Sequence, residues 1–310
     1  MTCYYPNTAH VTGTRAAGTK IIAFGLPKSG DQESFLLPCG QCHGCRLDRS
    51  IMWAARCMHE AQLHDDNQFI TLTYDIEPLD GSLNPPDFTK FMKRYRKSLG
   101  SDKIRFFHGA EYGDKLKRPH HHAIIFGHRF QDLEPFRECE GIITYYSPAL
   151  EKLWGHGYCT VSDVTLASAA YVARYCMKKV TTAKNSEDKH YAHYQKVSPT
   201  TGEIRQILPE YATMSRRPGI AKDWYDKYHS DIFPHDTCIV HGKTVKTPRY
   251  YENLLRSTDV PAFEELKAKR LQKALLPENQ YNNTPARLRV REKVKLASMA
   301  NITRNLHYDT

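Results

Sequence analysis

Residues 118–127 read Arg-Pro-His-His-His-Ala-Ile-Ile-Phe-Gly, a polar start followed by an apolar run. Alternate residues of a β-strand share a face, so His120 and His122 point together while His121 points the other way. The apolar residues that follow continue both faces, which predicts a strand buried on both sides. Two imidazoles on adjacent positions of one face can bind a single divalent ion.

A carboxylate is expected to join these imidazoles. Residues 104–112 have the composition of a strand, and residues 113–119 that of a turn, so Glu111 should return beside His120. A carboxylate and two imidazoles form a three-ligand site with open positions, suited to Mg²⁺ or Mn²⁺ held with a substrate phosphate. His108 is a competing third ligand.

The segment around residues 167–180 predicts a helix with Tyr171 and Tyr175 at i and i+4 on one face. Lys178 extends the same stripe. Two aromatic residues at this spacing are usually core residues, and only the nearby His-x-His strand favours catalysis. A tyrosine with a pKa near 10 needs a metal on the scissile phosphate and a cation such as Lys178 beside its phenolate.

The chain has nine cysteines, three of them at Cys39, Cys42 and Cys45. This spacing in a reducing compartment favours a metal over disulfides, and a structural Zn²⁺ with four ligands is the expectation. Cys3 is the preferred fourth ligand, with His43 or Cys57 as alternatives. An iron–sulfur cluster and unligated thiols are the competing interpretations.

The remaining elements follow from periodicity and turn residues. Helices are expected at residues 47–61, 87–99 with Asp87 as its cap, 147–155 and 218–228, and strands at 69–74 and 158–161, the latter at a sheet edge. Residues 264–310, with ten Lys/Arg against five Asp/Glu, are a basic tail or helical arm. The pattern is α+β, with an antiparallel sheet and helices on one side.

The 310 residues carry a formal net charge of +10, which favours a polyanionic partner such as nucleic acid. Hydrophobic residues make up 40%, enough for a sizeable core. There is neither a signal-peptide pattern nor an apolar run of bilayer length, so a soluble, intracellular protein is expected. The candidate DNA contacts are Lys90, Lys93, Arg94, Lys97, Arg118, Lys179, Arg216 and Arg217.

Taken together, these residues resemble the HUH endonuclease superfamily, and more closely the replication initiators of microviruses, the small single-stranded DNA phages, of the gokushovirus type. The matching segments are 38–46, 69–75, 109–113, 118–127, 171–179 and 215–220. They span well over half of the chain, and the set is specific although each piece alone is not.

The resemblance implies a ferredoxin-like, RRM-like palm with His120 and His122 on a central strand. It implies that Tyr171 and Tyr175 nick the origin through a 5′-phosphotyrosyl intermediate, leave a 3′-OH as primer, and later rejoin the strand. Glu111 as third ligand is a weaker implication, because that position varies in the superfamily. His121 fills a usually apolar position, which leaves a ligand pair shifted by one residue as an alternative.

The expected organisation is a Cys-rich segment over 1–64, an endonuclease domain over 65–230 and a basic extension over 231–310. The expected partners are origin DNA and host helicase and polymerase in the host cytoplasm, without a membrane, and the working expectation is a monomer. A host helicase is required because Gly242-Lys243-Thr244 lacks the preceding glycine of a phosphate-binding loop.

Two alternative functions compete with this interpretation. A plasmid initiator or relaxase of the same superfamily would share the chemistry at a different origin. A zinc-stabilised DNA-binding protein without catalysis would explain the charge and the cysteines, but not paired tyrosines beside a His-x-His strand.

Overall fold

The computed structural model describes residues 3–16, 20–27, 34–78, 81–113, 116–139, 142–175, 194–197, 201–233 and 235–300. The chain forms two compact units, one built on Met1–Arg49 with Asp259–Thr303 and one on Ser50–Thr258. The three-part division predicted from the sequence, with boundaries after residues 64 and 230, stays a prediction. Among the described residues, no helix combines the length and apolar character needed to cross a bilayer.

The first unit joins both ends of the chain. Its three strands form an antiparallel sheet in the order β2-β1-β3, with bounds β1 (Asn7–Thr14), β2 (Lys20–Phe24) and β3 (Ser34–Leu37). The C-terminal segment is helical, as one of the two expectations had it: α7 (Val260–Leu275), α8 (Pro277–Asn282) and α9 (Pro285–Ala300). Short strands separated by turn-forming residues explain why this sheet was not predicted.

The second unit is built on a seven-stranded antiparallel sheet in the order β12-β5-β6-β4-β9-β8-β7. The strands are β4 (Asn67–Leu72), β5 (Arg105–Tyr112), β6 (Pro119–Phe126), β7 (Glu134–Cys139), β8 (Ile142–Tyr146), β9 (Cys159–Ser162) and β12 (Tyr211–Met214). Strand β9 lies between β4 and β8, so the predicted edge position of residues 158–161 is wrong. The unpredicted hairpin β7–β8 extends the sheet beyond it.

The centre of this sheet has a ferredoxin-like order. Helix α2 (Pro85–Ser98) connects β4 to β5, and helix α3 (Pro148–Trp154) precedes β9. The four strands β5-β6-β4-β9 therefore form two interleaved βαβ units, each split by an antiparallel strand. The predicted α+β class with a central antiparallel sheet is confirmed.

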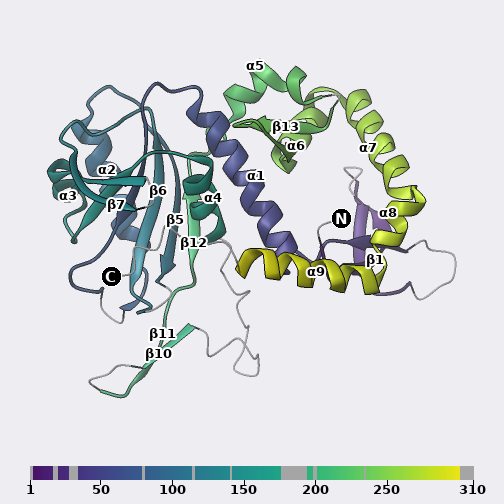
Figure 1. Cartoon of the computed structure of the whole chain (residues 1–310), viewed down its shortest axis with the longest axis horizontal. Coiled ribbons are helices and arrows are strands. Elements are labelled where there is room, and N and C mark those ends of the chain that lie inside the picture. Colours follow the sequence, from purple (N-terminus) through teal and green to yellow (C-terminus); the bar gives the residue numbers. More distant parts are fainter. Residues whose placement is uncertain are drawn as a thin grey trace. The chain divides into compact units, whose positions relative to one another are not determined.

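Helices cover both faces of the sheet, which corrects the expectation of helices on one side (Figure 1). On one face, Ile125 packs with residues of α2 and α3, including Phe91 and Trp154. On the other, Ile124 and Phe126 pack with α1 (His43–Ala61) and α4 (Leu166–Tyr175). Strand β6 is buried on both sides as predicted, because its alternating residues feed two separate cores.

Capping residues explain where several helices begin. Helix α3 has Ser147 as N-cap and Gly155 in the left-handed conformation at its end, as predicted. Asp87 is not the cap of α2: Asn84 holds that position, and Asp87 in the first turn accepts from the Asn84 amide at 2.9 Å. Helix α5 (Lys222–Ile232) begins four residues after Pro218, which lies in a turn instead.

The second unit is completed by four short strands and one helix. These are β10 (Gln195–Val197), β11 (Ile204–Gln206), β13 (Thr237–Val240), β14 (Lys243–Lys246) and α6 (Arg249–Thr258). Each pair of strands forms a separate antiparallel hairpin. Gly242 and Lys243 lie at the turn of β13–β14, in agreement with their interpretation as a turn.

Candidate active site

Glu111, His120 and His122 come together on the face of the sheet that α1 and α4 cover. In the β5–β6 ladder Glu111 pairs with His120 and Gly109 with His122. The Nε2 atoms of His120 and His122 lie 3.0 and 3.1 Å from the same Glu111 oxygen, Oε1. One ligand atom from each residue lies within 4.8 Å of the others, so these three side chains could hold one metal ion.

The second ring nitrogen of each histidine is held by the strand framework. His120 Nδ1 lies 3.2 Å from the carbonyl oxygen of Arg118, and His122 Nδ1 lies 3.0 Å from Thr71 Oγ1. A carbonyl only accepts, so His120 carries its proton on Nδ1. The Nε2 lone pair of a neutral His120 then faces the Glu111 carboxylate, and a cation between them relieves the repulsion of two acceptors.

The Glu111 carboxylate keeps its negative charge although it is buried. Burial raises the pKa of Glu111, but hydrogen bonds and charge from His120 and His122 outweigh it and lower that pKa overall. An ionised carboxylate beside two imidazole nitrogens fits a divalent cation with open coordination positions.

His121 and His108 form a separate network on the opposite face. His108 Nε2 lies 3.0 Å from His121 Nδ1, and His121 Nε2 lies 3.0 Å from the hydroxyl of Tyr74, which donates to Asp87. Burial lowers the pKa of His121 to about 3, so it stays neutral. The structure therefore brings neither His108 nor His121 to the Glu111 group.

A cavity of about 430 Å³ opens over this group. Its lining includes His120, His122 and Tyr171, and from the sheet strands the side chains Thr71, Thr160, Phe136, Arg137 and Tyr158. A volume of this order accommodates a nucleotide-sized ligand.

Tyr171 reaches the cavity from helix α4. Its ring centroid lies 5.1 Å from that of His122, edge to face at 86°, and its side chain is 9% exposed. The helix starts with reciprocal bonds between Thr165 and Ser168, and Ser50 of α1 donates to the Ala170 carbonyl at 2.8 Å. These contacts fix the position of Tyr171 over the sheet.

Other predicted catalytic residues are only partly covered by the structure. Tyr175 is the last described residue of α4, one turn beyond Tyr171, and its side chain lies outside the described part. Lys178 and Lys179 also lie outside the described residues.

The predicted DNA contacts fall in different places. Lys90, Lys93 and Lys97 are exposed on α2, which covers the face opposite to the Glu111 group. Arg94 on the same helix donates to the carbonyls of Leu153 and Trp154 at 2.7 Å and closes the end of α3.

Arg118 lines the cavity, donates to the Tyr74 carbonyl at 2.6 Å and pairs with Glu77 at 3.4 Å. It is the predicted DNA contact that the structure places next to the Glu111 group.

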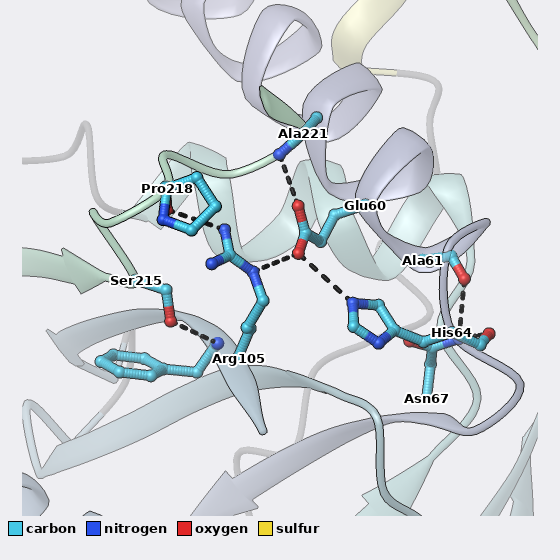
Figure 2. A network of polar contacts seen from close by, with 9 residues as sticks. Glu60, Ala61, His64, Asn67, Arg105, Ser215, Pro218 and Ala221 are labelled. Carbon is cyan, nitrogen blue, oxygen red and sulfur yellow. Dashed lines mark hydrogen bonds and ion pairs between the residues drawn. The ribbon is translucent and has the colours of Figure 1, made fainter. Parts of the chain in front are cut away.

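The segment with Arg216 and Arg217 is fastened by a buried carboxylate, Glu60 of α1 (Figure 2). Glu60 binds Arg105, accepts from His64 at 3.3 Å and from the Ala221 amide at 2.5 Å. Arg105 in turn donates to the Pro218 carbonyl at 2.9 Å. The two exposed arginine side chains are therefore carried by a loop that is tied to α1 and β5.

Four thiols meet in the first unit. Cys3 Sγ lies 3.6 Å from Cys39 Sγ and 3.9 Å from Cys42 Sγ, and Cys45 completes a group within 4.8 Å. Backbone amides of Tyr4, Cys39 and Cys42 point at the sulfurs, at 3.2–3.4 Å. Cys3 is thus placed as predicted, and the alternatives His43 and Cys57 are not part of this group.

Thiolate character fits this arrangement. Burial raises the pKa of Cys42, but amide donors from Tyr4 and Cys45 and the neighbouring thiols lower it to about 7. Four sulfurs with amide donors fit a tetrahedral ion.

Sequence reasoning missed Thr71, Phe136 and Arg137. Thr71 lies on the face of Phe69 by simple alternation and could have been found from the strand pattern. Phe136 and Arg137 lie in a hairpin that carries no periodic signal.

Comparisons with known proteins agree with this geometry. A sequence-family model for replication-associated proteins of the ORF2 type matches residues 67–180, which include β4, the Glu111 group and α4. The replication-associated protein VP4 of Bdellovibrio phage phiMH2K is 35% identical over 279 residues, 87% of this chain and 82% of that protein. The replication-associated protein ORF2 of Spiroplasma virus 4 is 31% identical, covering 70% and 66%.

ORF4 of Chlamydia phage 1, also named a replication-associated protein, is 30% identical over 73% of this chain and 55% of its own length. No solved structure gives a significant match. The fold, the site and these relatives together define a replication-associated protein. The chain belongs to the family of microvirus replication-associated proteins.

Proposed function

We propose that this protein is a metal-dependent, site- and strand-specific DNA nickase and ligase that starts and ends rolling-circle replication of a phage genome. The observation that carries the proposal is Tyr171, whose ring lies 5.1 Å from that of His122 over a cavity shared with His120. Membership of a family named for replication supports a role in phage DNA replication.

The proposed chemistry is phosphoryl transfer to tyrosine. Mg²⁺ or Mn²⁺ bound by Glu111, His120 and His122 would supply positive charge to the scissile phosphate. The Tyr171 hydroxyl oxygen forms a bond to phosphorus while the bond from phosphorus to O3′ breaks. The phenol proton passes to solvent, and the leaving O3′ takes up a proton. The products are a 5′-phosphotyrosyl bond and a free 3′-OH that primes synthesis.

Tyr175 is the proposed second nucleophile. It follows Tyr171 by one helical turn in α4, so both phenols can be directed to the same phosphate. Lys178 is proposed to hold the phenolate and the phosphate oxygens. The phosphotyrosyl bond conserves the energy of the broken phosphodiester, so rejoining needs no ATP.

The remaining predicted contacts are assigned to the DNA on either side of the nick. Arg118, Lys179, Arg216 and Arg217 are proposed to bind phosphates near the site, and the exposed lysines of α2 to bind DNA on the opposite face. Unwinding and synthesis are assigned to host helicase and polymerase in the host cytoplasm.

The four-cysteine group is proposed to hold a structural Zn²⁺ that is separate from the catalytic metal. Its amide-to-sulfur bonds and four thiols support that assignment. The boundaries after residues 64 and 230 are proposed as functional divisions of the chain.

Incubation with single-stranded oligonucleotides that tile the phage origin, in Mn²⁺, tests the proposal. The wild type should form a covalent protein–DNA adduct that survives SDS, and chelation by EDTA should prevent it. Replacing both His120 and His122 with Ala should abolish the adduct while the circular dichroism spectrum is retained. Retardation of the DNA without an adduct would instead support a non-catalytic binding protein.

Substituting the tyrosines tests the alternation. Tyr171→Phe and Tyr175→Phe each remove one hydroxyl, so each single variant should keep some cleavage but lose multi-round circle production. The double variant should form no adduct. Full multi-round replication by Tyr175→Phe, or an adduct in the double variant, would contradict the alternating scheme.

A further inference from the structure

Strand β7 contributes two consecutive residues, Phe136 and Arg137, to the cavity that holds His120 and His122. In a regular strand, consecutive side chains point to opposite faces. One of the two should therefore point away from the cavity, and a local feature must redirect it.

That feature is a β-bulge at Phe136. The β7–β8 register pairs Pro135 with Tyr145 and then Arg137 with Thr144, so that Phe136 has no partner on β8. Bulges bend an edge strand and re-aim its side chains, and they are frequent beside active sites. Here the bulge directs an aromatic ring and a guanidinium to the same side.

The aromatic ring of Phe136 is available to a ligand. Its side chain is 56% exposed although it lines a cavity, and its inner edge rests on Tyr158, with ring centroids 5.3 Å apart. Tyr158 is backed by Tyr146, stacked at 6.0 Å and 8°. Phe136 is thus an exposed ring on an aromatic support, which a flat ligand can cover.

The polar groups around this ring also lack protein partners. The Arg137 guanidinium forms no hydrogen bond or ion pair with the described part of the chain, and its side chain is exposed. The Tyr158 hydroxyl is buried and, among the described residues, has no hydrogen-bond partner. A free cation and an unpaired hydroxyl beside an aromatic ring match the phosphate and base of a nucleotide.

We infer that Phe136, Arg137 and Tyr158 form a nucleotide subsite, in which a base next to the scissile phosphate stacks on Phe136 and its phosphate binds Arg137. This inference rests on the proposed function for the position of the scissile phosphate. The subsite holds the single strand flat against β7 and β9 and so fixes the bond that Tyr171 attacks. Stacking tolerates any base, so the subsite sets position and affinity instead of sequence.

Binding of a fluorescein-labelled 15-mer of deoxythymidylate, measured by anisotropy in Mn²⁺, tests the subsite. Phe136→Ala should weaken binding about 5- to 150-fold, the range expected for loss of one base–aromatic stack. Phe136→Trp should bind like the wild type. Phe136→Leu, which keeps apolar volume but no ring, should be weakened like the alanine variant. Arg137→Gln should reduce the log–log salt slope by about 0.7.

Ile143→Ala provides the matched control. Ile143 is an exposed apolar residue of the same hairpin, next in sequence to Thr144 and therefore on the other face of β8. Its replacement should leave the dissociation constant unchanged.

Photo-crosslinking locates the contact directly. The same 15-mer with 5-iodouracil in place of thymine should crosslink to the peptide that contains Phe136. Wild-type affinity in Phe136→Ala, or crosslinks that map only to other peptides, would overturn the subsite. If the wild type crosslinks at Phe136 but forms no tyrosyl adduct with origin DNA, the subsite stands and the proposed nicking function fails.

Discussion

Thr71 connects the proposed metal ligands to the interior of the sheet. Its hydroxyl lies 3.0 Å from His122 Nδ1, on the neighbouring strand. Partners of this kind orient the imidazole, and their loss typically costs 10- to 100-fold in metal affinity.

Thr71→Val keeps the shape of the side chain and removes the hydroxyl. We expect Mn²⁺ affinity, measured by isothermal titration calorimetry, to fall about 10- to 100-fold while the fold is retained. Thr160, the β9 residue that pairs with Thr71 and also lines the cavity, supplies the control. Equal Mn²⁺ affinities for the Thr71→Val and Thr160→Val variants would contradict the role given to Thr71.

His59 makes the stability of the second unit depend on pH. Its ring stacks on Trp224 at 3.6 Å and lies 2.8 Å from the Tyr251 hydroxyl, in a position without exposure to solvent. Burial lowers the pKa of His59 to about 4, and a backbone contact with Ile239 offsets only part of this effect.

Acid should therefore destabilise the protein through His59. Between pH 6.5 and 4 the unfolded chain binds a proton at this residue and the native chain does not, so the free energy of unfolding falls as the pH drops. From pH 7 to 4.5 we expect His59 to contribute a loss of about 2–3 kcal/mol in urea denaturation. In His59→Gln the loss between these two pH values should be smaller by that amount; an unchanged pH dependence would refute the assignment.

The loop that carries Arg216 and Arg217 depends on helix α1. Glu60 accepts bonds from two groups and pairs with Arg105, and Arg56 of the same helix donates to the Ile220 carbonyl at 2.9 Å (Figure 2). One helix and one strand thus hold residues that lie about 160 positions further along the chain.

Glu60→Gln should lower the free energy of unfolding by about 2–4 kcal/mol, because it leaves the partners of a buried charge uncompensated. Amide hydrogen exchange should rise at residues 215–221. Glu264→Gln, which breaks an exposed pair with Lys267, should change stability by less than about 1 kcal/mol. Equal effects of the two substitutions would show that the Glu60 network contributes nothing special.

Local rules explain what could be predicted of these elements. The β5–β6 hairpin brings Glu111 to His120 through a short connection, so alternation and one turn were enough to predict the group. Helix α3 was predicted because Ser147 and Gly155 mark both of its ends.

Non-local pairing explains what was missed. Strand β9 becomes an inner strand only because β8 pairs with it, and a single pair, Tyr145 with Val161, records that contact. The bulge at Phe136 is an irregularity of pairing, and no composition pattern announces it. Helix α1 covers the second face of the sheet although it precedes the whole sheet in sequence, which periodicity alone does not reveal.

At the scale of the molecule, the four-cysteine group belongs to the unit built from both chain ends. The unit also contains a bond from the Tyr5 hydroxyl to Glu292 of α9 at 2.5 Å. A metal at the cysteines would therefore stabilise the fold of the N-terminal segment onto which α9 packs.

Metal analysis of the purified protein should find about one zinc per chain, lost in a Cys42→Ser, Cys45→Ser double variant. Limited proteolysis of that variant should cleave within Met1–Arg49 while Ser50–Thr258 resists. Cys159→Ala, which removes a buried thiol outside the group, should keep its zinc. A zinc-free wild type that resists protease equally well would contradict a structural metal.

The shared origin of that unit from both chain ends sets an order of events during translation. Residues up to Arg49 leave the ribosome first, but their partner segment begins only at Asp259, after the whole of Ser50–Thr258. At about 5–20 residues per second, the N-terminal segment waits roughly 10–40 s for it. All four thiols lie within the first 45 residues, so metal capture requires nothing that is made later. The nascent chain can thus close its cysteine group early and hold a docking surface for α9 until synthesis ends.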